Sequence, residues 1–271
     1  MPSVSTRLGE VFYQTQGEGV PVILLHATLH DHHDFDTIAT RLSKNYHIIA
    51  IDWPWHGESK GLATTEALSA MSLADVLEDI VTTLKLPPAF FIGNSVGGFA
   101  AARLAITHPE YVRGLVLVNN GGFVNWPLFA RVFARLLGIP FFARLLMPFL
   151  VPKYMLPQTP EDKEISRRAQ ERARTQSGAT VAAAIWRSFT DPGHDLRSRG
   201  SQIKAPTLIV WGSRDPLYRP DVKQTVQEYI PGSRLEVFNT GHVVFSSKPD
   251  EFMRVVEPFF QSALESPDGE L

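Results

Sequence analysis

Apolar runs of four to six residues recur along the chain, and segments with apolar residues every three or four positions separate them. Uninterrupted apolar runs are typical of strands that are buried on both faces of a parallel sheet. Their alternation with helices predicts βαβ crossovers, and therefore an α/β fold with a mostly parallel central sheet and helices on both faces. The predicted strands cover residues 11–15 (an edge strand), 21–26, 47–52, 89–92, 115–118, 207–211 and 235–238.

Helical periodicity predicts four helices between and after these strands. We place Ser72 at the N-cap of the first helix, because the acidic residue Asp75 follows three positions later, and Pro87 ends the helical pattern. A helix of small residues follows Ser95 directly. The two remaining helices cover about residues 221–230 and 248–260.

Residues 121–200 differ from the rest of the chain. They contain several prolines and helical patches rich in Phe, Leu and Arg, and they lack any strand-like run. We interpret them as a helical lid that is inserted between two strands of the sheet. The α/β core is then formed by residues 1–120 and 201–271.

Between Leu128 and Val151 nearly every residue is apolar, and Arg131, Arg135 and Arg144 are the main exceptions. A helix that is apolar on most faces must bury them against the sheet, an apolar substrate pocket, a partner subunit or a bilayer surface. We expect a lid over an apolar pocket, with a monomer or a homodimer formed through the lid. The candidate pocket residues are Phe123, Phe129, Phe133, Phe141, Phe142 and Met147 in the lid, and Ala27, Asn94, Trp55 and Val243 in the core.

The composition argues against several classes of function. A formal net charge of -2 over 271 residues gives no electrostatic footprint for nucleic acid or an anionic membrane. The absence of cysteine excludes disulfides, thiol nucleophiles and Cys-ligated metal sites. The N-terminus lacks the apolar core of a secretory signal, and no apolar run is long enough to span a bilayer. We therefore expect a cytoplasmic protein.

The sequence Gly93-Asn94-Ser95-Val96-Gly97 has the G-x-S-x-G pattern at a predicted junction between strand and helix. In that context the turn is sharp, and its glycines keep side chains out of a crowded bend. The serine hydroxyl then stands above the carboxyl end of the sheet, so we predict that Ser95 is a nucleophile. A nucleotide-binding glycine loop is the alternative, but the pattern G-x-G-x-x-G is absent.

A serine hydroxyl needs a base within hydrogen-bond reach and an acid that orients the base. Loops at the carboxyl ends of two later strands supply both groups, in the chain order Ser, Asp, His. Asp215 follows the strand at residues 207–211, and His242 follows the strand at residues 235–238. The backbone N–H groups of Val96 and Thr28 are the candidate donors for a developing oxyanion.

Three histidines and two aspartates stand close together at residues 30–34 and suggest a metal site. Adjacent side chains cannot all point at one ion, and the segment lies where a loop enters a helix. We therefore interpret residues 30–34 as a solvated helix start and expect neither a metal nor another cofactor.

Taken together, these motifs resemble those of the α/β-hydrolase superfamily over essentially the whole chain. The resemblance implies a triad of Ser95, His242 and Asp215, with an oxyanion hole formed by Thr28 and Val96. It also implies that His26 and His56 are structural partners of the loops that carry them. The matching stretches are residues 24–28, 52–59, 93–98, 212–215 and 241–242.

The chain departs from the superfamily pattern at two positions. Ala27 and Trp55 stand where the superfamily usually has glycine. The motif at residues 93–98 is similar to that of carbon–carbon hydrolases of aromatic catabolism, but Val243 stands where those enzymes usually have tryptophan.

The sequence thus predicts a cofactor-free serine hydrolase that acts on small to medium apolar carboxylic esters or related carbonyl compounds. A carbon–carbon bond hydrolase acting on ring-fission diketone acids is one alternative. A ligand receptor of the same fold, with little or no turnover, is the other.

Overall fold

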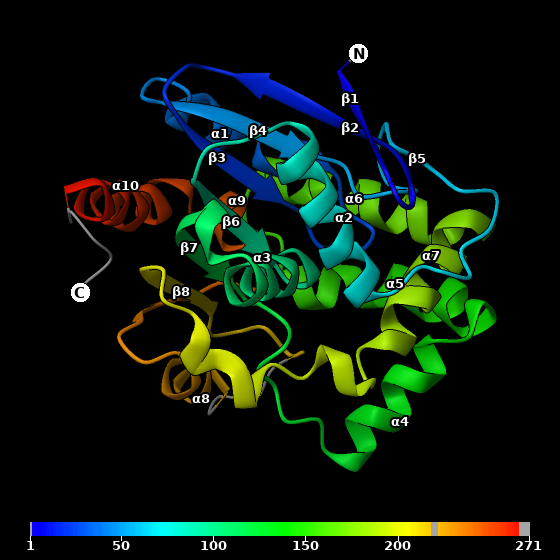
Figure 1. Cartoon of the computed structure of the whole chain (residues 1–271). Helices are drawn as coiled ribbons and strands as arrows, with labels where there is room; N and C mark the ends of the chain where they lie inside the picture. The colour runs from blue at the N-terminus through cyan, green and yellow to red at the C-terminus, as the bar shows by residue number, and fades with distance from the viewer. Residues whose placement is uncertain (1, 218–221, 266–271) are drawn as a thin grey trace.

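A central sheet organises the part of the chain that the computed structural model describes, residues 2–217 and 222–265 (Figure 1). The nine strands are β1 Ser3–Thr6, β2 Gly9–Gln16, β3 Val20–Leu25, β4 Tyr46–Ile51, β5 Lys60–Gly61, β6 Ala89–Asn94, β7 Val112–Val118, β8 Thr207–Gly212 and β9 Arg234–Phe238. The order across the sheet is β1-β2-β4-β3-β6-β7-β8-β9, and β5 also pairs with β2. Across the sheet from β4 through β3, β6, β7 and β8 to β9, neighbouring strands pair in parallel. Strand β2 pairs antiparallel with β1, β4 and β5. The mostly parallel α/β sheet predicted from the apolar runs is confirmed.

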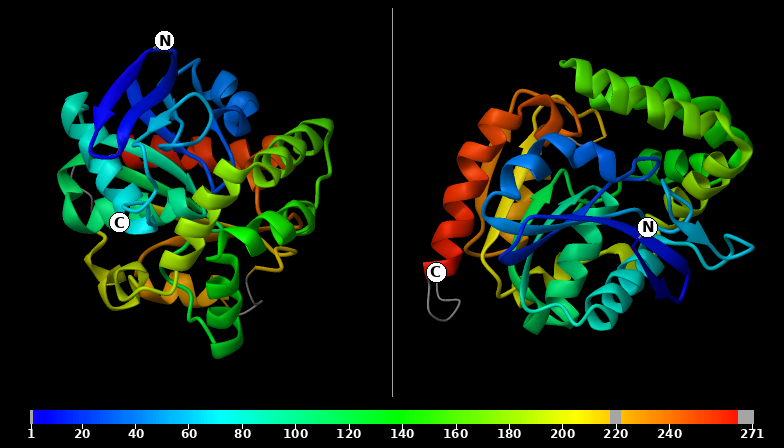
Figure 2. Two further views of the ribbon diagram at one scale, coloured as in Figure 1. Left: turned by 90° about the vertical axis from the view of Figure 1, so that its right-hand side faces the viewer. Right: turned by 90° about the horizontal axis from the view of Figure 1, so that it is seen from above.

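Helices cover both faces of this sheet (Figure 2). The helices of the core are α1 Asp36–Leu42, α2 Ala70–Thr83, α3 Val96–Thr107, α8 Val222–Tyr229, α9 Val244–Ser247 and α10 Pro249–Glu265. Helices α2 and α3 pack on one face, and α1, α9 and α10 pack on the other.

Alternate residues of each central strand enter the two apolar layers. On β6, Phe90 and Ile92 belong to the layer beneath α10, where Phe90 stacks on Phe260 with ring centroids 4.1 Å apart. Phe91 points the other way and packs in the layer that contains Leu73 of α2. This period of two explains why the strands are apolar at every position, since neither face meets water.

Residues 121–200 lie between β7 and β8 and are helical, as the composition of this segment predicts (Figure 1). Their helices are α4 Leu128–Leu137, α5 Pro140–Met155, α6 Pro160–Arg174 and α7 Gln176–Ser188. Helices α5, α6 and α7 pack on one another, while α4 extends from the group (Figures 1 and 2). Within the described residues no single helix is long and apolar enough to cross a membrane, although α4 and α5 together reach that length with a bend of 107°.

Two local predictions were wrong. The strand predicted at residues 11–15 is not an edge strand, because the short polar strand β1, which has no apolar run, pairs outside it. Helix α2 begins three residues before the predicted start. Ser69 is its N-cap and Ser72 is its third residue, and the two hydroxyls satisfy each other's backbone N–H groups.

Candidate active site

Ser95 forms a sharp turn between β6 and α3, with φ of 56° and ψ of -114°. Residues other than glycine rarely adopt this conformation, and such strain is typical of functional sites. The turn needs its neighbouring glycines. A Cβ atom on Gly97 would lie 2.3 Å from the carbonyl oxygen of Leu25, and one on Gly93 would lie 2.6 Å from Gly97. The sequence motif therefore folds as the strained strand–turn–helix that it predicts.

His242 and Asp215 meet at the carboxyl ends of β8 and β9. The Nδ1 atom of His242 lies 2.5 Å from Oδ2 of Asp215, and both side chains are buried. The other carboxylate oxygen of Asp215 accepts a hydrogen bond from the backbone N–H of Leu217 at 3.0 Å. Ser95 and His242 both line a small cavity of about 20 Å³. The structure thus brings all three predicted residues together.

The backbone of His242 is held on both sides. Its N–H donates to the carbonyl of Tyr154 at 2.9 Å, and its carbonyl accepts from the side-chain amides of Asn94 and Asn119 at 3.1 and 2.9 Å. Asn94 and Asn119 come from the ends of β6 and β7, so neighbouring strands fix the position of the histidine. Asn94, predicted to line the pocket, is instead a buried partner of the His242 backbone.

Thr28 and Val96, the predicted oxyanion donors, both lie near Ser95. Val96 is the first residue of α3, whose first N–H groups have no partner within the helix. Thr28 lines the same small cavity as Ser95 and His242. It belongs to a turn in which the N–H of His30 donates to Ala27 at 3.2 Å and Leu29 has a φ of 72°.

A larger cavity of about 540 Å³ opens beside Ser95 and Val96. Its volume suits a small-molecule site. His194 contributes a polar group to its otherwise apolar wall, and burial lowers the pKa of His194 to about 4 despite a hydrogen bond to the backbone of Phe189. Apolar side chains of the wall include Val124, Trp126, Phe129, Phe133, Leu136, Trp186, Phe189 and Leu217.

Of the ten candidate pocket residues, four line one of these two cavities. Phe129 and Phe133 line the larger cavity, and Ala27 and Met147 line the smaller one. Phe129 and Phe133 belong to α4, which lines the same cavity as Ser95, while Met147 belongs to α5 and Ala27 follows β3.

The other six candidates do not line either cavity. Phe123 and Val243 are buried in the two apolar layers of the core, and Asn94 holds His242. Trp55 packs against Gly61 of β5, and its Nε1 donates to the carbonyl of Leu62 at 3.0 Å. Phe141 and Phe142 contact each other on α5, and Phe141 is largely exposed. Helix α5 is apolar on most faces, so its sequence did not reveal which face turns toward Ser95.

Comparison with known proteins agrees with the observed fold. The family model described as the alpha/beta hydrolase fold matches residues 20–249. The chain belongs to the alpha/beta hydrolase fold family. This confirms the resemblance that the sequence motifs indicate.

Relatives of this alpha/beta hydrolase include enzymes with different substrates. A 2-hydroxy-6-oxononadienedioate/2-hydroxy-6-oxononatrienedioate hydrolase of Burkholderia vietnamiensis is 27% identical, with 93% of this chain and 91% of the relative covered. A pimeloyl-[acyl-carrier protein] methyl ester esterase of Neisseria meningitidis is 27% identical, with coverage of 92% and 79%. The crystal structure of a bacterial membrane phospholipase A has a TM-score of 0.82 at 23% identity, covers 98% of this chain and 86% of its own, and shows the shared fold.

The histidine-rich segment of this alpha/beta hydrolase does not form a metal centre. His30, His32 and His33 each pair through Nδ1 with a different carboxylate, Asp34 at 2.5 Å, Asp52 at 2.9 Å and Asp36 at 2.9 Å. Among the described residues no group of three or more potential ligands is arranged around one point. The segment forms the 3₁₀ turn His32–Phe35 that enters α1, as expected, but His30 and His32 are buried rather than solvated.

His30 connects this segment to His242 through Tyr154. Its Nε2 lies 3.2 Å from the hydroxyl of Tyr154, and the ring of Tyr154 packs edge-on against His242 with centroids 5.3 Å apart. Burial, together with the charges of Asp34 and Asp215, raises the pKa of Tyr154 well above its usual range. Tyr154 is therefore a neutral phenol beside His242.

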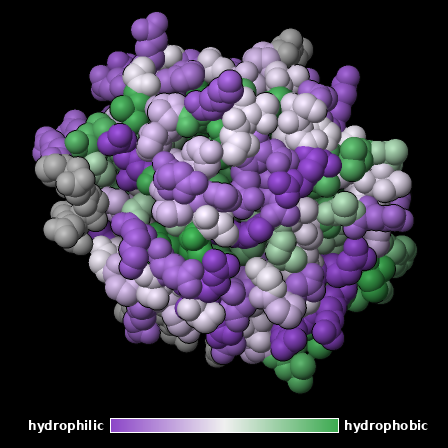
Figure 3. Space-filling view, viewed as in Figure 1, coloured by the Kyte–Doolittle hydropathy of each residue, from purple (hydrophilic) through white to green (hydrophobic). Residues whose placement is uncertain are grey.

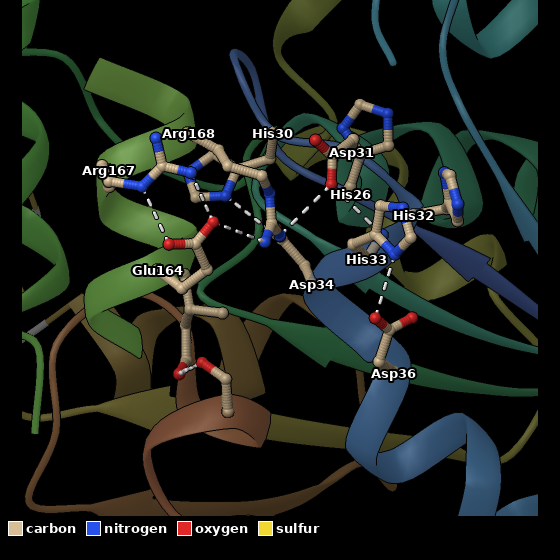
Figure 4. A network of polar contacts seen from close by, with 12 residues as sticks. His26, His30, Asp31, His32, His33, Asp34, Asp36, Glu164, Arg167 and Arg168 are labelled. Atoms are coloured by element: carbon tan, nitrogen blue, oxygen red, sulfur yellow. Dashed lines mark hydrogen bonds and ion pairs between the residues drawn. The ribbon is translucent and has the colours of Figure 1, made fainter. Parts of the chain in front are cut away.

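Arginines of α6 hold the loop that carries Thr28. Arg172 donates to the backbone carbonyls of Leu29 and His30 and to Asp31, the last at 2.9 Å. Arg168 lies 3.4 Å from Asp31 and 3.5 Å from Asp34 (Figure 4). Burial alone would raise the pKa of Asp31, but the charges of Arg168 and Arg172 hold it far below its usual range.

Sequence reasoning missed Tyr154, His194 and Trp186. All three lie in residues 121–200, far along the chain from Ser95, and none belongs to a recognisable motif. The one available signal was Tyr154, whose hydroxyl interrupts a mostly apolar helix, whereas His194 stands in a polar stretch between Asp191 and Arg199 and gave no signal.

Proposed function

We propose that this alpha/beta hydrolase is a cofactor-free serine hydrolase that cleaves small to medium apolar carboxylic esters through an acyl-enzyme. One observation carries the proposal. Ser95 stands in a strained turn on the same small cavity as His242, which contacts buried Asp215 at 2.5 Å. The family and the esterases among its relatives support hydrolysis as the reaction class.

In the proposed mechanism, the hydroxyl of Ser95 attacks the ester carbonyl while His242 takes its proton. Asp215 keeps the Nδ1–H tautomer of the imidazole and stabilises the imidazolium that forms. The N–H groups of Thr28 and Val96 stabilise the oxyanion. His242 returns the proton to the leaving alcohol, then activates water, which releases the acid from Ser95.

The larger cavity supports an apolar acyl group as the specificity element. Its wall is almost entirely aliphatic and aromatic, and it begins at Ser95 itself. We propose that residues 121–200 act as a lid, because α4 and α7 supply Phe129, Phe133 and Trp186 to this wall. The expected cytoplasmic location stays a prediction.

A carbon–carbon hydrolase is the second candidate. The motif at residues 93–98 and the relative from Burkholderia vietnamiensis both favour it. The same triad would then cleave the bond between two carbons of a diketone acid. Comparing turnover of such an acid with turnover of simple esters distinguishes the two functions.

Acyl chain length tests the apolar pocket. We expect kcat/KM to rise from acetyl through butyryl to hexanoyl p-nitrophenyl esters, because each CH₂ group that the cavity buries contributes up to about 0.8 kcal/mol. Steady-state kinetics of the three esters measures the trend. A flat or falling series would contradict the apolar acyl pocket, while still leaving the serine chemistry open to its own test.

A further inference from the structure

We propose that the outer face of α4 and α5 docks on an anionic membrane surface. We call this surface the α4–α5 apolar face and define it by exposed side chains on α4, on α5 and on Ile139 between them. The proposal concerns binding to lipid and does not depend on which bond the enzyme cleaves. The residues of the face are Leu128, Phe129, Val132, Ile139, Phe141, Leu145 and Phe149.

The apolar face is concentrated rather than scattered. Seven of the ten large hydrophobic side chains that are exposed among the described residues belong to it. On α5 the members Phe141, Leu145 and Phe149 are four positions apart, so they form one stripe along the helix. Single exposed apolar residues need no explanation, but a continuous apolar stripe in water marks an interaction surface.

The charges around the face identify the partner. Residues 121–160 contain four basic side chains, Arg131, Arg135, Arg144 and Lys153, and no acidic one. All four are exposed. The net charge of -2 for the whole chain conceals this local excess, which is why the composition gave no sign of a membrane. Apolar side chains flanked by cations fit an anionic lipid surface, where the chains enter the interface and the cations meet headgroups.

The face adjoins the larger cavity. Phe129 and Val132 are exposed on α4 and also line the cavity wall next to Ser95. Figure 3 shows hydrophobic atoms at the lower edge of the molecule, where α4 extends outward in Figure 1. A docked enzyme would therefore present its cavity to the bilayer, and apolar substrates dissolved in lipid could enter without crossing water.

Vesicle sedimentation of the full chain tests this proposal. We expect the wild type to sediment with vesicles of phosphatidylcholine and phosphatidylglycerol, more weakly with phosphatidylcholine alone, and less as salt rises. Replacing two residues that lie outside the cavities, Leu145→Ser with Phe149→Ser, should weaken binding at least about tenfold. Turnover of a soluble acetyl ester should stay unchanged.

Matched variants control for a general loss of surface hydrophobicity. Leu62 and Val237 are exposed by 47% and 43%, similar to the 52% of Leu145, but lie away from α4 and α5. Leu62→Ser with Val237→Ser should bind vesicles as the wild type does. Arg135→Gln should weaken binding to the anionic vesicles by a few fold and leave binding to phosphatidylcholine unchanged.

Three results would overturn the proposal. In the first, the wild type fails to sediment with anionic vesicles. In the second, the variant with Leu145→Ser and Phe149→Ser binds as tightly as the control variant with Leu62→Ser and Val237→Ser. In the third, the wild type would be a dimer by analytical ultracentrifugation and would not bind vesicles, while the variant with Leu145→Ser and Phe149→Ser would be a monomer. The face would then bind a second copy of the chain. The salt dependence of the wild type provides a test even if that variant folds poorly.

Discussion

Individual side chains at the site are constrained by unusual backbone or by burial. Ser95 and Leu29 both have positive φ values, and hydrogen bonds from neighbouring elements hold each of them in place. His194 lies between the rings of Phe99 and Phe189, with centroids 4.5 and 4.9 Å away, and its Nε2 atom has no hydrogen-bond partner in the described part of the chain. Burial keeps this imidazole neutral in the folded protein. Because protonating it opposes folding, the free energy of unfolding depends on pH.

Because the folded protein keeps His194 neutral, the free energy of unfolding decreases in acid. Its folded pKa of about 4 lies below the unfolded value of about 6.5, so the unfolded chain binds more protons between these values. We expect this residue to cost about 2 kcal/mol of unfolding free energy between pH 7 and pH 5. Urea unfolding at both pH values should show a smaller loss for His194→Gln than for the wild type. Equal losses would show that His194 does not titrate in this way.

Other buried histidines also change the stability of the protein in acid, and not all in the same direction. Burial also lowers the pKa values of His26 and His56, so both add to the loss of stability in acid. Burial lowers the pKa of His32 too, but the hydrogen bond to Asp52 and the charges of Asp52, Asp31 and Asp36 together outweigh burial and leave the pKa raised. His32 therefore adds stability in acid, opposite to His26 and His56. Because His194→Gln changes one residue, the difference between this variant and the wild type reports on His194 alone.

At the scale of elements, helix α6 and the loop after β3 depend on each other. Arg172 donates to two backbone carbonyls of the turn that includes Thr28, and Leu29 in that turn has strained backbone. Losing these hydrogen bonds would let the turn relax and move the N–H of Thr28. Arg167, five positions earlier on α6, pairs with Glu164 and Glu171 on its own helix and with no other carboxylate among the described residues, so it serves as a control.

We therefore expect Arg172→Gln to lower kcat by about tenfold or more with little change in KM, because a misplaced oxyanion donor weakens the transition state more than substrate binding. Arg172→Lys should recover part of the loss. Ester kinetics, corrected for the fraction of active enzyme by titration with a slow acylating ester, gives both constants. The prediction fails if Arg172→Gln and Arg167→Gln behave alike.

The elements also show what sequence can reveal. The buried strands were predicted because a short run that is apolar at every position is compatible with few other structures. Ser95, Asp215 and His242 were predicted because each follows a strand end, where a parallel sheet brings its loops together. The lining of the cavity was predicted only in part, since the rotation of α5 and the approach of Trp186 and His194 depend on how whole helices dock.

At the scale of the whole molecule, the fold separates rigidity from specificity. The ends of β6, β7 and β8 fix the positions of Ser95 and His242 through hydrogen bonds between neighbouring strand ends. Residues 121–200 supply much of the cavity wall and, within the part of the chain that the structure describes, all but three of the large exposed apolar side chains. We therefore expect changes on α4 to alter substrate choice and surface binding, whereas Arg172 of α6 and Tyr154 of α5 connect other parts of this segment to the Thr28 turn and to His242.

The central claim is that Ser95 forms an acyl-enzyme that His242 then hydrolyses. Rapid mixing with p-nitrophenyl butyrate, followed by acid quench and mass spectrometry of the peptides, tests this claim most directly. We predict a burst of p-nitrophenol, a butyryl group on the peptide that contains Ser95, steady turnover afterwards, and none of these in Ser95→Ala. A burst with negligible turnover would favour a receptor, and full activity in Ser95→Ala without acylation would contradict the account.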